Sequence, residues 1–316
     1  MVARPRRSER VSSRASAFDI PNSACQCRQL RGQARTTPLS FEGTTAVKPL
    51  VLSLRQRPDQ RLDLSALVPH KLAGKSVAEI ERIDLSTSRH RVDVGEVFRV
   101  RAGNPEQIRL EGACDRLDLI GHGMSSGEMT VEGDVGAKAG RLMNGGRLVI
   151  RGNAGPWAAS GMRAGHLEIA GSVGDRLGGP LAGEVAGMRG GVVLVGGDAG
   201  ERAGDRLRRG TIIIQGGAGP YAGSRMLAGT LVVRRATGAL PGYLMRRGTI
   251  ICGAPGTVLS PTFVDCGIHH LIGMRLLAAF VRSYNKQVAS ILDRPLRRFA
   301  GDMAALGKGE IFCLPS

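Results

Sequence analysis

Aromatic side chains and long apolar runs are both scarce in this 316-residue sequence. Aromatic residues make up only 3%, so a core must be assembled from small and branched side chains, which the 42% hydrophobic content permits. No stretch approaches the roughly 20 consecutive apolar residues that a membrane-spanning helix requires. This shortage argues against a helical membrane protein, and we expect a soluble chain.

Recognisable catalytic and metal-binding motifs are also missing. The sequence contains no phosphate-binding G-x-x-x-x-G-K-[ST] segment, and its repeat positions supply no cluster of carboxylates. Cys266-x-x-His269-His270 has a spacing typical of metal ligands, but no second half of such a site accompanies it. His122 and His166 fall at strand edges, where we expect solvent exposure. We predict no catalytic residue and no metal site in this chain.

The cysteines do not form the disulfide framework of a small secreted domain. They are scattered along the chain, as Cys25, Cys27, Cys114, Cys252, Cys266 and Cys313. Cys252 falls at an inward position of the repeat described below, where it can act as a small apolar filler. This usage predicts a reducing, cytoplasmic location.

Glycine and positive charge are in excess. The 46 glycines are about 15% of the chain, against a usual share of roughly 7%. The formal net charge is +17. Residues 1–45 hold eight arginines, no lysine and three acids (+5), which leaves 36 basic and 24 acidic residues (+12) for the remainder. A fold this basic favours an anionic partner, such as nucleic acid, an acidic subunit or a polyanionic cofactor, although solubility is a sufficient alternative.

The N-terminal third falls into two parts. Residues 1–45 are rich in Arg and Ser and poor in large apolar residues, which predicts a disordered basic tail. For residues 46–105 we expect a small N-terminal α/β cap. It would contain strands at Pro49–Leu54 and 97–101 and a short helix at 76–83.

A glycine-rich repeat of 19 residues occupies residues 106–254. Its start glycines are Gly127, Gly146, Gly165, Gly191, Gly210, Gly229 and Gly248, at spacings of 19, 19, 26, 19, 19 and 19 residues. Two and four places after each start glycine stand the pairs Met129/Val131, Leu148/Ile150, Leu167/Ile169, Val193/Val195, Ile212/Ile214, Leu231/Val233 and Ile250/Cys252. Such alternation is typical of a short strand with one buried face.

The period of the repeat indicates the fold. Nineteen residues are too few for a helical-hairpin repeat of roughly 34 residues. They suit one coil of a single-stranded β-helix, whose strands pair with their equivalents above and below at about 4.8 Å. We predict an all-β, right-handed β-helix solenoid, followed at 255–316 by a C-terminal cap with helical spacing over 271–292. Seven extra residues within 179–187 predict a loop that leaves the stack.

Two further columns accompany the repeat. Three places before each following start glycine stands Met143, Met162, Met188, Leu207, Met226 or Met245, which we interpret as core packing rather than a soft-metal site. Beside this methionine column stand seven arginines: Arg163, Arg189, Arg208, Arg209, Arg225, Arg246 and Arg247. Equivalent positions stack, so we expect these guanidinium groups along one face, where they bind an anion or acidic partner or pair with local acids.

With the repeat laid out, the sequence resembles the C-subunit of formylmethanofuran dehydrogenase, and especially its homologue in bacterial formyltransferase/hydrolase complexes. The likeness is carried by GGDAGERAGDRLRRG at 196–210, GPYAGSRMLAG at 219–229, RFAGD at 298–302 and LGKGE at 306–310. It runs from about residue 48 to the C-terminus. The same glycine repeat is similar to the C-terminal domain of glutamate synthase, so the repeat alone identifies only a superfamily.

The resemblance implies a non-catalytic scaffold subunit in one-carbon metabolism linked to tetrahydromethanopterin and methanofuran (formaldehyde oxidation). It also implies two partners, a formyltransferase subunit and an amidohydrolase-like subunit, to which the chemistry belongs. No cofactor is assigned to this chain itself, although the polyglutamate arm of a methanofuran-type cofactor would suit its arginines.

Two alternatives stay open. One is a glutamate-synthase-like domain protein, and the other is a stand-alone polyanion-binding β-helix. Nucleic-acid binding is disfavoured because only Trp157 and Tyr221 provide aromatic rings at the turns.

Overall fold

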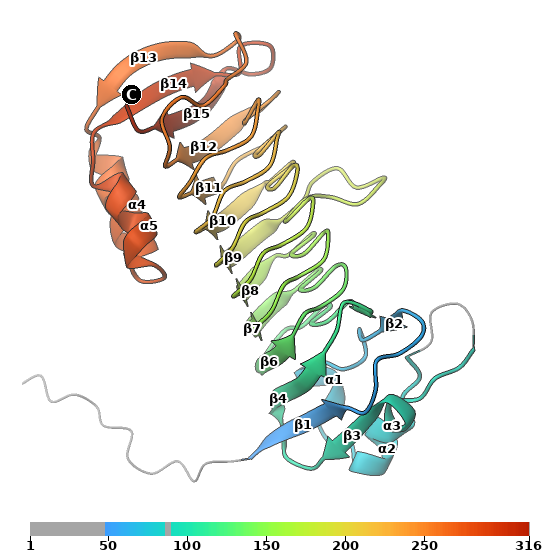
Figure 1. The fold of residues 1–316 in the computed structure, drawn as a ribbon. Coiled ribbons are helices and arrows are strands. Elements are labelled where there is room, and N and C mark those ends of the chain that lie inside the picture. Colours follow the sequence, from blue (N-terminus) through green and yellow to red (C-terminus); the bar gives the residue numbers. More distant parts are fainter. Residues whose placement is uncertain (1–47, 86–89, 316) are drawn as a thin grey trace, which may run out of the picture. The chain divides into compact units, whose positions relative to one another are not determined.

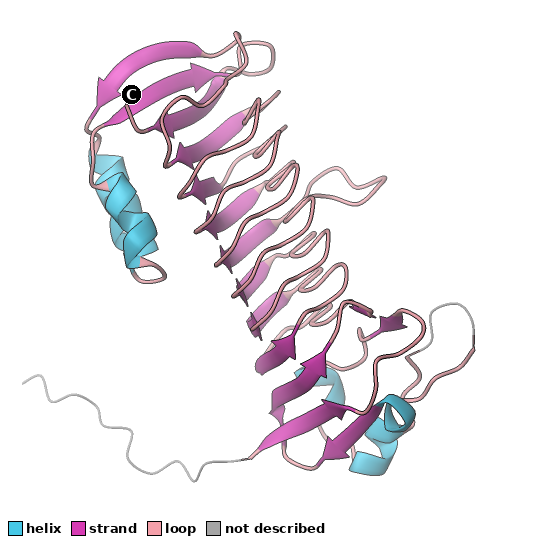
Figure 2. Cartoon of the chain, viewed as in Figure 1, coloured by secondary structure: helices cyan, strands magenta, loops and turns pink. Residues whose placement is uncertain are grey.

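The computed structural model describes residues 48–85 and 90–315, so the tail predicted at 1–45 lies outside the described residues. Within the described part, strands predominate and the few helices are short (Figure 2). Thirteen of these strands form one large sheet (Figure 1), in the order β3-β1-β4-β6-β7-β8-β9-β10-β11-β12-β15-β14-β13. The all-β class predicted from the sequence is confirmed.

The strands of the large sheet are β1 (Pro49–Leu54), β3 (Phe98–Arg101), β4 (Asn104–Ala113), β6 (Glu128–Gly133), β7 (Asn144–Ile150), β8 (Ala164–Ile169), β9 (Arg189–Val195), β10 (Arg209–Ile214), β11 (Thr230–Val233), β12 (Arg247–Cys252), β13 (Val264–His269), β14 (Leu296–Gly301) and β15 (Lys308–Cys313). A second sheet pairs β2 (Leu62–Asp63) with β5 (Leu117–Asp118). The helices are α1 (Pro69–Leu72), α2 (Val77–Glu81), α3 (Val94–Val97), α4 (Ile272–Arg282) and α5 (Lys286–Leu292).

Parallel pairing runs through the middle of the large sheet. It links β1 to β4, then β6 through β12 in chain order, and finally β12 to β15. At the ends, β3 pairs antiparallel with β1, and β14 pairs antiparallel with both β15 and β13. The edges of the described sheet are therefore β3 and β13.

The strand register confirms the alignment of the repeat. The inward residues of one repeat lie beside the inward residues of the next on the adjacent strand. For example, Ile212 pairs with Leu231, and Leu231 pairs in turn with Ile250. Their side chains are fully buried. Cys252 is also buried and pairs with Cys313 of β15, as expected of a small apolar filler. Aliphatic ladders of this kind form the interior, because alternate residues of each strand point to the same side.

A second ladder links the repeats away from the strands. Single parallel bridges join residues eight places after each start glycine, from Val135 to Ala154 and onward to Thr237. Beside them, polar side chains accept backbone N–H groups of the next repeat: Asp134 Oδ1 accepts from Asn153 N at 2.7 Å, and Asp198 Oδ1 accepts from Gly217 N at 2.7 Å. These carboxylates cap the backbone, because a turn leaves N–H groups without strand partners.

The start glycines are required by backbone geometry. Gly210 has φ +97°, and a Cβ atom there would lie 2.7 Å from the carbonyl oxygen of Gly191, the start glycine of the preceding repeat. A side chain would therefore be strained and would also press the repeats apart.

The N-terminal predictions agree with the structure. The strand predicted at Pro49–Leu54 is β1. The helix predicted at 76–83 is α2, which begins after a capping box formed by Ser76 and Glu79. The strand predicted at 97–101 is β3, which follows directly from α3.

The C-terminal region differs from its prediction in two respects. The single helix expected at 271–292 is two helices, because Asn285 adopts an extended backbone and caps α5 by accepting the N–H of Val288 at 2.9 Å. Strands β13, β14 and β15 were not predicted from the sequence, and β15 pairs in register with β12.

The two C-terminal helices cover part of the outer side of the sheet. Leu194, Ile213, Val232 and Ile251 occupy the strand position between the two inward residues, and they pack against α4 and α5. Inward and outward positions therefore alternate along these strands as predicted, but in β9 to β12 the outward residues are also apolar, and the two helices cover them. The longest described helix, α4, has 11 residues, and none of the described helices is long and apolar enough to cross a membrane.

The predicted insertion is a loop between β8 and β9, and it projects from the repeats in Figure 1. The N–H of Met188 donates to the carbonyl of Gly178 at 2.6 Å and closes the base of the loop. The chain then re-enters the repeat in the expected phase at Gly191, so the insertion leaves the ladders intact.

Candidate functional site

Four of the predicted arginines occupy one backbone position in successive repeats. The N–H groups of Arg163, Arg189, Arg208 and Arg246 each donate to the carbonyl of the methionine column one repeat earlier, at 2.6 to 2.9 Å. Their side chains are all exposed. The backbone positions of this column therefore stack from repeat to repeat, with Leu227 in place of arginine in one repeat.

Six of the seven predicted arginines have no carboxylate within 4.0 Å among the residues that the structure describes. They are Arg163, Arg189, Arg208, Arg209, Arg246 and Arg247. Arg189 still influences Glu184, whose pKa is lowered mainly by a hydrogen bond from Arg141 and in smaller part by Arg189. Neighbouring guanidinium groups repel one another, so the row of arginines at the beginnings of these strands favours binding an anion.

Arg225 differs from the other six, because it neutralises a buried carboxylate. Asp205 is fully buried, and its Oδ1 accepts hydrogen bonds from Arg225 Nε at 2.9 Å and Ser224 Oγ at 2.9 Å. Arg225 Nη2 also donates to Asp205 Oδ2. Two roles were considered for these arginines, and Arg225 takes the second of them, pairing with a local acid.

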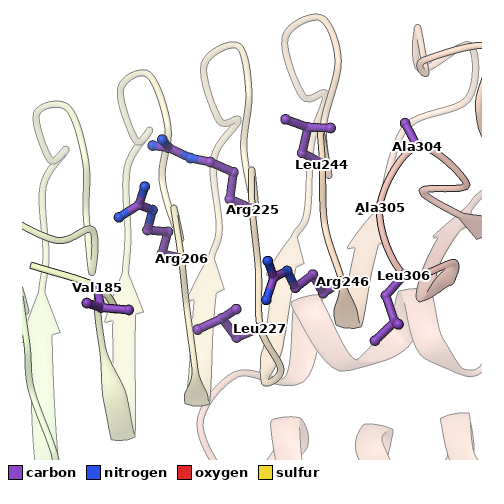
Figure 3. A pocket seen from close by; sticks show the side chains of 9 residues that line it. All are labelled: Val185, Arg206, Arg225, Leu227, Leu244, Arg246, Ala304, Ala305 and Leu306. Carbon is purple, nitrogen blue, oxygen red and sulfur yellow. The ribbon is translucent and has the colours of Figure 1, made fainter.

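A cleft of about 670 Å³ lies beside these arginines (Figure 3). Its cationic lining is Arg206, Arg225 and Arg246, and its apolar lining includes Leu227 and Leu244. Val185 of the insertion and residues 304–306 complete the wall. The cleft thus combines apolar side chains with guanidinium groups from three successive repeats, a combination that suits an anionic group carried on an apolar or flexible chain.

Two features of this cleft were not predicted from the sequence. Arg206 occupies the same place in its repeat as Arg225, and its Nη1 donates to the carbonyl of Glu184 in the insertion at 3.1 Å. The wall at 304–306 is held by the buried Asp302, which accepts the N–H groups of Leu244 at 2.9 Å and Ala304 at 2.8 Å. The position of Arg206 was available from the repeat, but the contact between Asp302 and Leu244 joins residues 58 apart in the chain.

His122 lies in a turn between β5 and β6, and His166 lies within β8. Both are half-buried, so the expectation of solvent exposure at strand edges was wrong. The ring of His166 stacks on Tyr284, with centroids 5.3 Å apart and planes at 15°. Burial lowers the pKa of His166, and the nearby Arg147 lowers it further. Burial, then Lys71 and Arg141, lowers the pKa of His122.

The Cys266-x-x-His269-His270 segment makes local contacts. The ring of His269 lies 2.8 Å from the carbonyl of Cys266, through Nε2, and the Cys266 thiol donates to the carbonyl of Val264 at 3.5 Å. Within the described ranges, no group of three or more His, Cys, Asp and Glu side chains is placed to hold a metal ion.

Comparison with known proteins gives the family. No family model matches the chain. The C-subunit of the formyltransferase/hydrolase complex Fhc of Methylorubrum extorquens is 50% identical over 262 residues, which are 82% of this chain and 98% of that protein. The chain belongs to this C-subunit family. The resemblance found in the sequence is therefore confirmed.

More distant relatives share only part of the chain. The C-subunit of the molybdenum-containing formylmethanofuran dehydrogenase 1 of Methanosarcina barkeri is 31% identical over 33% of this chain and 37% of its own length. The C-subunit of the tungsten-containing formylmethanofuran dehydrogenase 2 of Methanothermobacter marburgensis is 35% identical over 29% of this chain and 36% of its own length.

A solved structure agrees with the sequence match. A chain of the formyltransferase/hydrolase complex of Methylorubrum extorquens, determined by X-ray crystallography in complex with methylofuran, superposes with a TM-score of 0.81 at 42% identity. The match covers 84% of this chain and all of that chain. The family assignment thus rests on sequence and fold together.

Proposed function

We propose that this member of the C-subunit family is a scaffold subunit of a formyltransferase/hydrolase complex, with no active site of its own. The observation that carries the proposal is the 50% identity over 98% of the length of a named subunit of such a complex. Its partners would be a formyltransferase subunit and an amidohydrolase-like subunit, in one-carbon metabolism linked to methanofuran. The cytoplasmic location expected from the cysteines stays a prediction.

The scaffold role includes a specific fold, a right-handed single-stranded β-helix. Two ladders support it, because equivalent residues of successive repeats pair both in the strands and at the single bridges near the turns. A chain that pairs with itself at two places in each repeat builds a long, stiff body. Such a body offers extended faces to several partners at once.

We assign the uncompensated arginines to contact with an acidic partner surface or with the polyglutamate arm of a methanofuran-type cofactor. Support comes from the exposed guanidinium groups and the cleft around Arg246. Arginine suits this role because its planar fork binds carboxylates in bidentate fashion. Arg225 would take part through its outer face, since Asp205 already occupies one side of its guanidinium.

The proposal is tested first by mild affinity purification of the tagged protein from its native host, followed by mass spectrometry of the copurifying chains. We expect a formyltransferase and an amidohydrolase-like chain in fixed ratio to the tagged protein. Recovery of the protein alone would remove the basis for the scaffold assignment. Retention on polyanions that falls steeply with salt would then favour the stand-alone polyanion-binding alternative.

The arginine assignment has its own test, charge reversal with Arg208→Glu and Arg246→Glu in one variant. The matched control is Arg235→Glu, because Arg235 is also exposed but follows the end of β11 rather than preceding a strand. We expect the double variant to lose about tenfold or more in complex yield or in retained cofactor, since reversing a charge against an acidic partner costs more than its removal. Equal yield and activity in both variants would contradict the assignment.

A further inference from the structure

Helix α4 carries exposed apolar side chains along its outer side. Ile272, Leu276 and Phe280, which together form the α4 stripe, are 75%, 70% and 41% exposed. Their spacing of four residues places them on one helix face. The opposite face packs Ala278 and Val281 against the sheet. The helix is therefore apolar on two sides, of which one is covered.

Exposed apolar side chains also occur on β13, the strand that precedes α4 in the chain. Val264 and Ile268 are 51% and 59% exposed. In the described sheet β13 pairs only with β14 and presents its other backbone edge. Isolated exposed apolar residues are common on protein surfaces, but three on one helix face, together with a neighbouring strand that has an open edge, mark an interaction surface.

The α4 stripe is held in place by aromatic contacts. The ring of Phe280 packs edge-to-face on Tyr284, with centroids 5.2 Å apart. Tyr284 in turn stacks on His166 of β8. The C-terminal end of α4 is thus fixed to the repeats, and a partner that binds it need not order a mobile helix.

We infer that the α4 stripe is the docking face for another protein subunit, which offers an apolar groove rimmed by acidic side chains. This inference rests on the proposed function. Arg275, which precedes Leu276 on α4, and Lys286, the first residue of α5, are exposed and have no carboxylate within 4.0 Å among the described residues. The neighbouring Arg282 and Asp265 are already paired, with Asp293 and Arg297 respectively.

Charge argues against two other occupants of the stripe. In a two-fold contact with a second copy, the positive charges beside the stripe would meet the same charges on the copy, because an isologous interface repeats one surface on both sides. The chain's own residues 1–45 carry +5 and few large apolar side chains, so they complement neither the charge nor the apolar surface. A different subunit with acidic groups meets both requirements.

The test is copurification of the tagged chain with the other subunits of its complex, coexpressed from the same host. The variant Ile272→Asp/Leu276→Asp places charge in the proposed contact, and Ile272→Gln/Leu276→Gln removes apolar surface without adding charge. Val258→Asp is the matched control, since Val258 is 65% exposed and lies outside the helix and the sheet. Thermal unfolding of each isolated chain serves as the folding control, because all the replaced side chains are exposed.

We expect the two double variants to bind the partner subunits about a hundredfold more weakly or worse, as the loss of two buried aliphatic side chains implies. Val258→Asp should copurify like the wild type. Undiminished copurification of both double variants would overturn the inference and leave the scaffold role intact. A wild-type chain that copurifies with no subunit would instead refute the scaffold role. A wild-type dimer that the double variants convert to monomers would assign the stripe to a second copy, against the inference.

Discussion

Removing Arg225 should destabilise the protein more than any other single arginine replacement in the predicted set. In Arg225→Met the side-chain length is kept, but the fully buried carboxylate of Asp205 loses its cation and, within the described chain, keeps only the hydrogen bond from Ser224. Breaking a buried pair in this way costs about 3–5 kcal/mol. Arg225 itself is 34% exposed at its side chain, so solvent screens part of the interaction and we expect about 3 kcal/mol.

This loss of folding stability should be measurable by thermal unfolding and in a double-mutant cycle. For a domain of this size, about 3 kcal/mol corresponds to a fall of roughly 6 to 12 °C in the thermal midpoint. Asp205→Asn should cost less, because an amide retains the Ser224 contact and the freed Arg225 can turn towards water. Adding Asp205→Asn to Arg225→Met should recover part of the loss, since no buried charge is then left without a partner.

Two results would contradict this expectation. A midpoint of Arg225→Met within about 1 °C of the wild type would mean that water or a rearranged side chain compensates Asp205 fully. Strict additivity of the two replacements would mean that the carboxylate and the guanidinium do not stabilise each other. Arg246→Met is the matched control, because Arg246 is exposed and has no carboxylate within 4.0 Å in the described chain; its midpoint should not move.

Two further predictions concern the repeats and their contact with the C-terminal helices. Gly210→Ala should lower stability by about 1–3 kcal/mol through its positive φ and its close approach to the preceding repeat, measured by denaturant unfolding. Gly183→Ala, in the insertion, has a similar φ but open space around the added Cβ, and should cost less. The pKa of His166 is lowered by burial, so below the ordinary value of 6.5 the unfolded chain takes up a proton that the folded chain resists. Stability should therefore fall between about pH 7 and pH 5, and His166→Gln should weaken this fall; identical pH profiles of the thermal midpoint would exclude the stacked ring as its source.

Much of the candidate site could be located from the repeat, but the role of each arginine in it could not be predicted. The sequence places Arg225 directly before the methionine column and Arg246 directly after it, but it does not say which of them pairs with an acid. The structure separates them, because Asp205 of the preceding repeat meets Arg225 and no carboxylate within 4.0 Å meets Arg246 in the described chain. Such a partner depends on side-chain direction across the stack, which the period does not specify.

The repeat, its phase and the inward ladders follow from the amino-acid order alone. A start glycine followed by apolar residues at two and four places leaves one strand register that buries both, and a shift by one residue would expose them. The family likeness followed from the same repeat together with the segments at 196–210, 219–229, 298–302 and 306–310.

The way in which the C-terminal region extends the repeat is visible only in three dimensions. Gly309, Ile311 and Cys313 repeat the inward pattern, but they follow Gly248 after 61 residues, so a search at fixed spacing misses β15. The apolar outward residues of β9 to β12, such as Ile213, indicate that another element packs on this side of the sheet, but they do not indicate which element it is. Long-range packing determines which element covers them. Helices α4 and α5 bury these side chains, because the chain turns back along the sheet before β14 and β15 complete it.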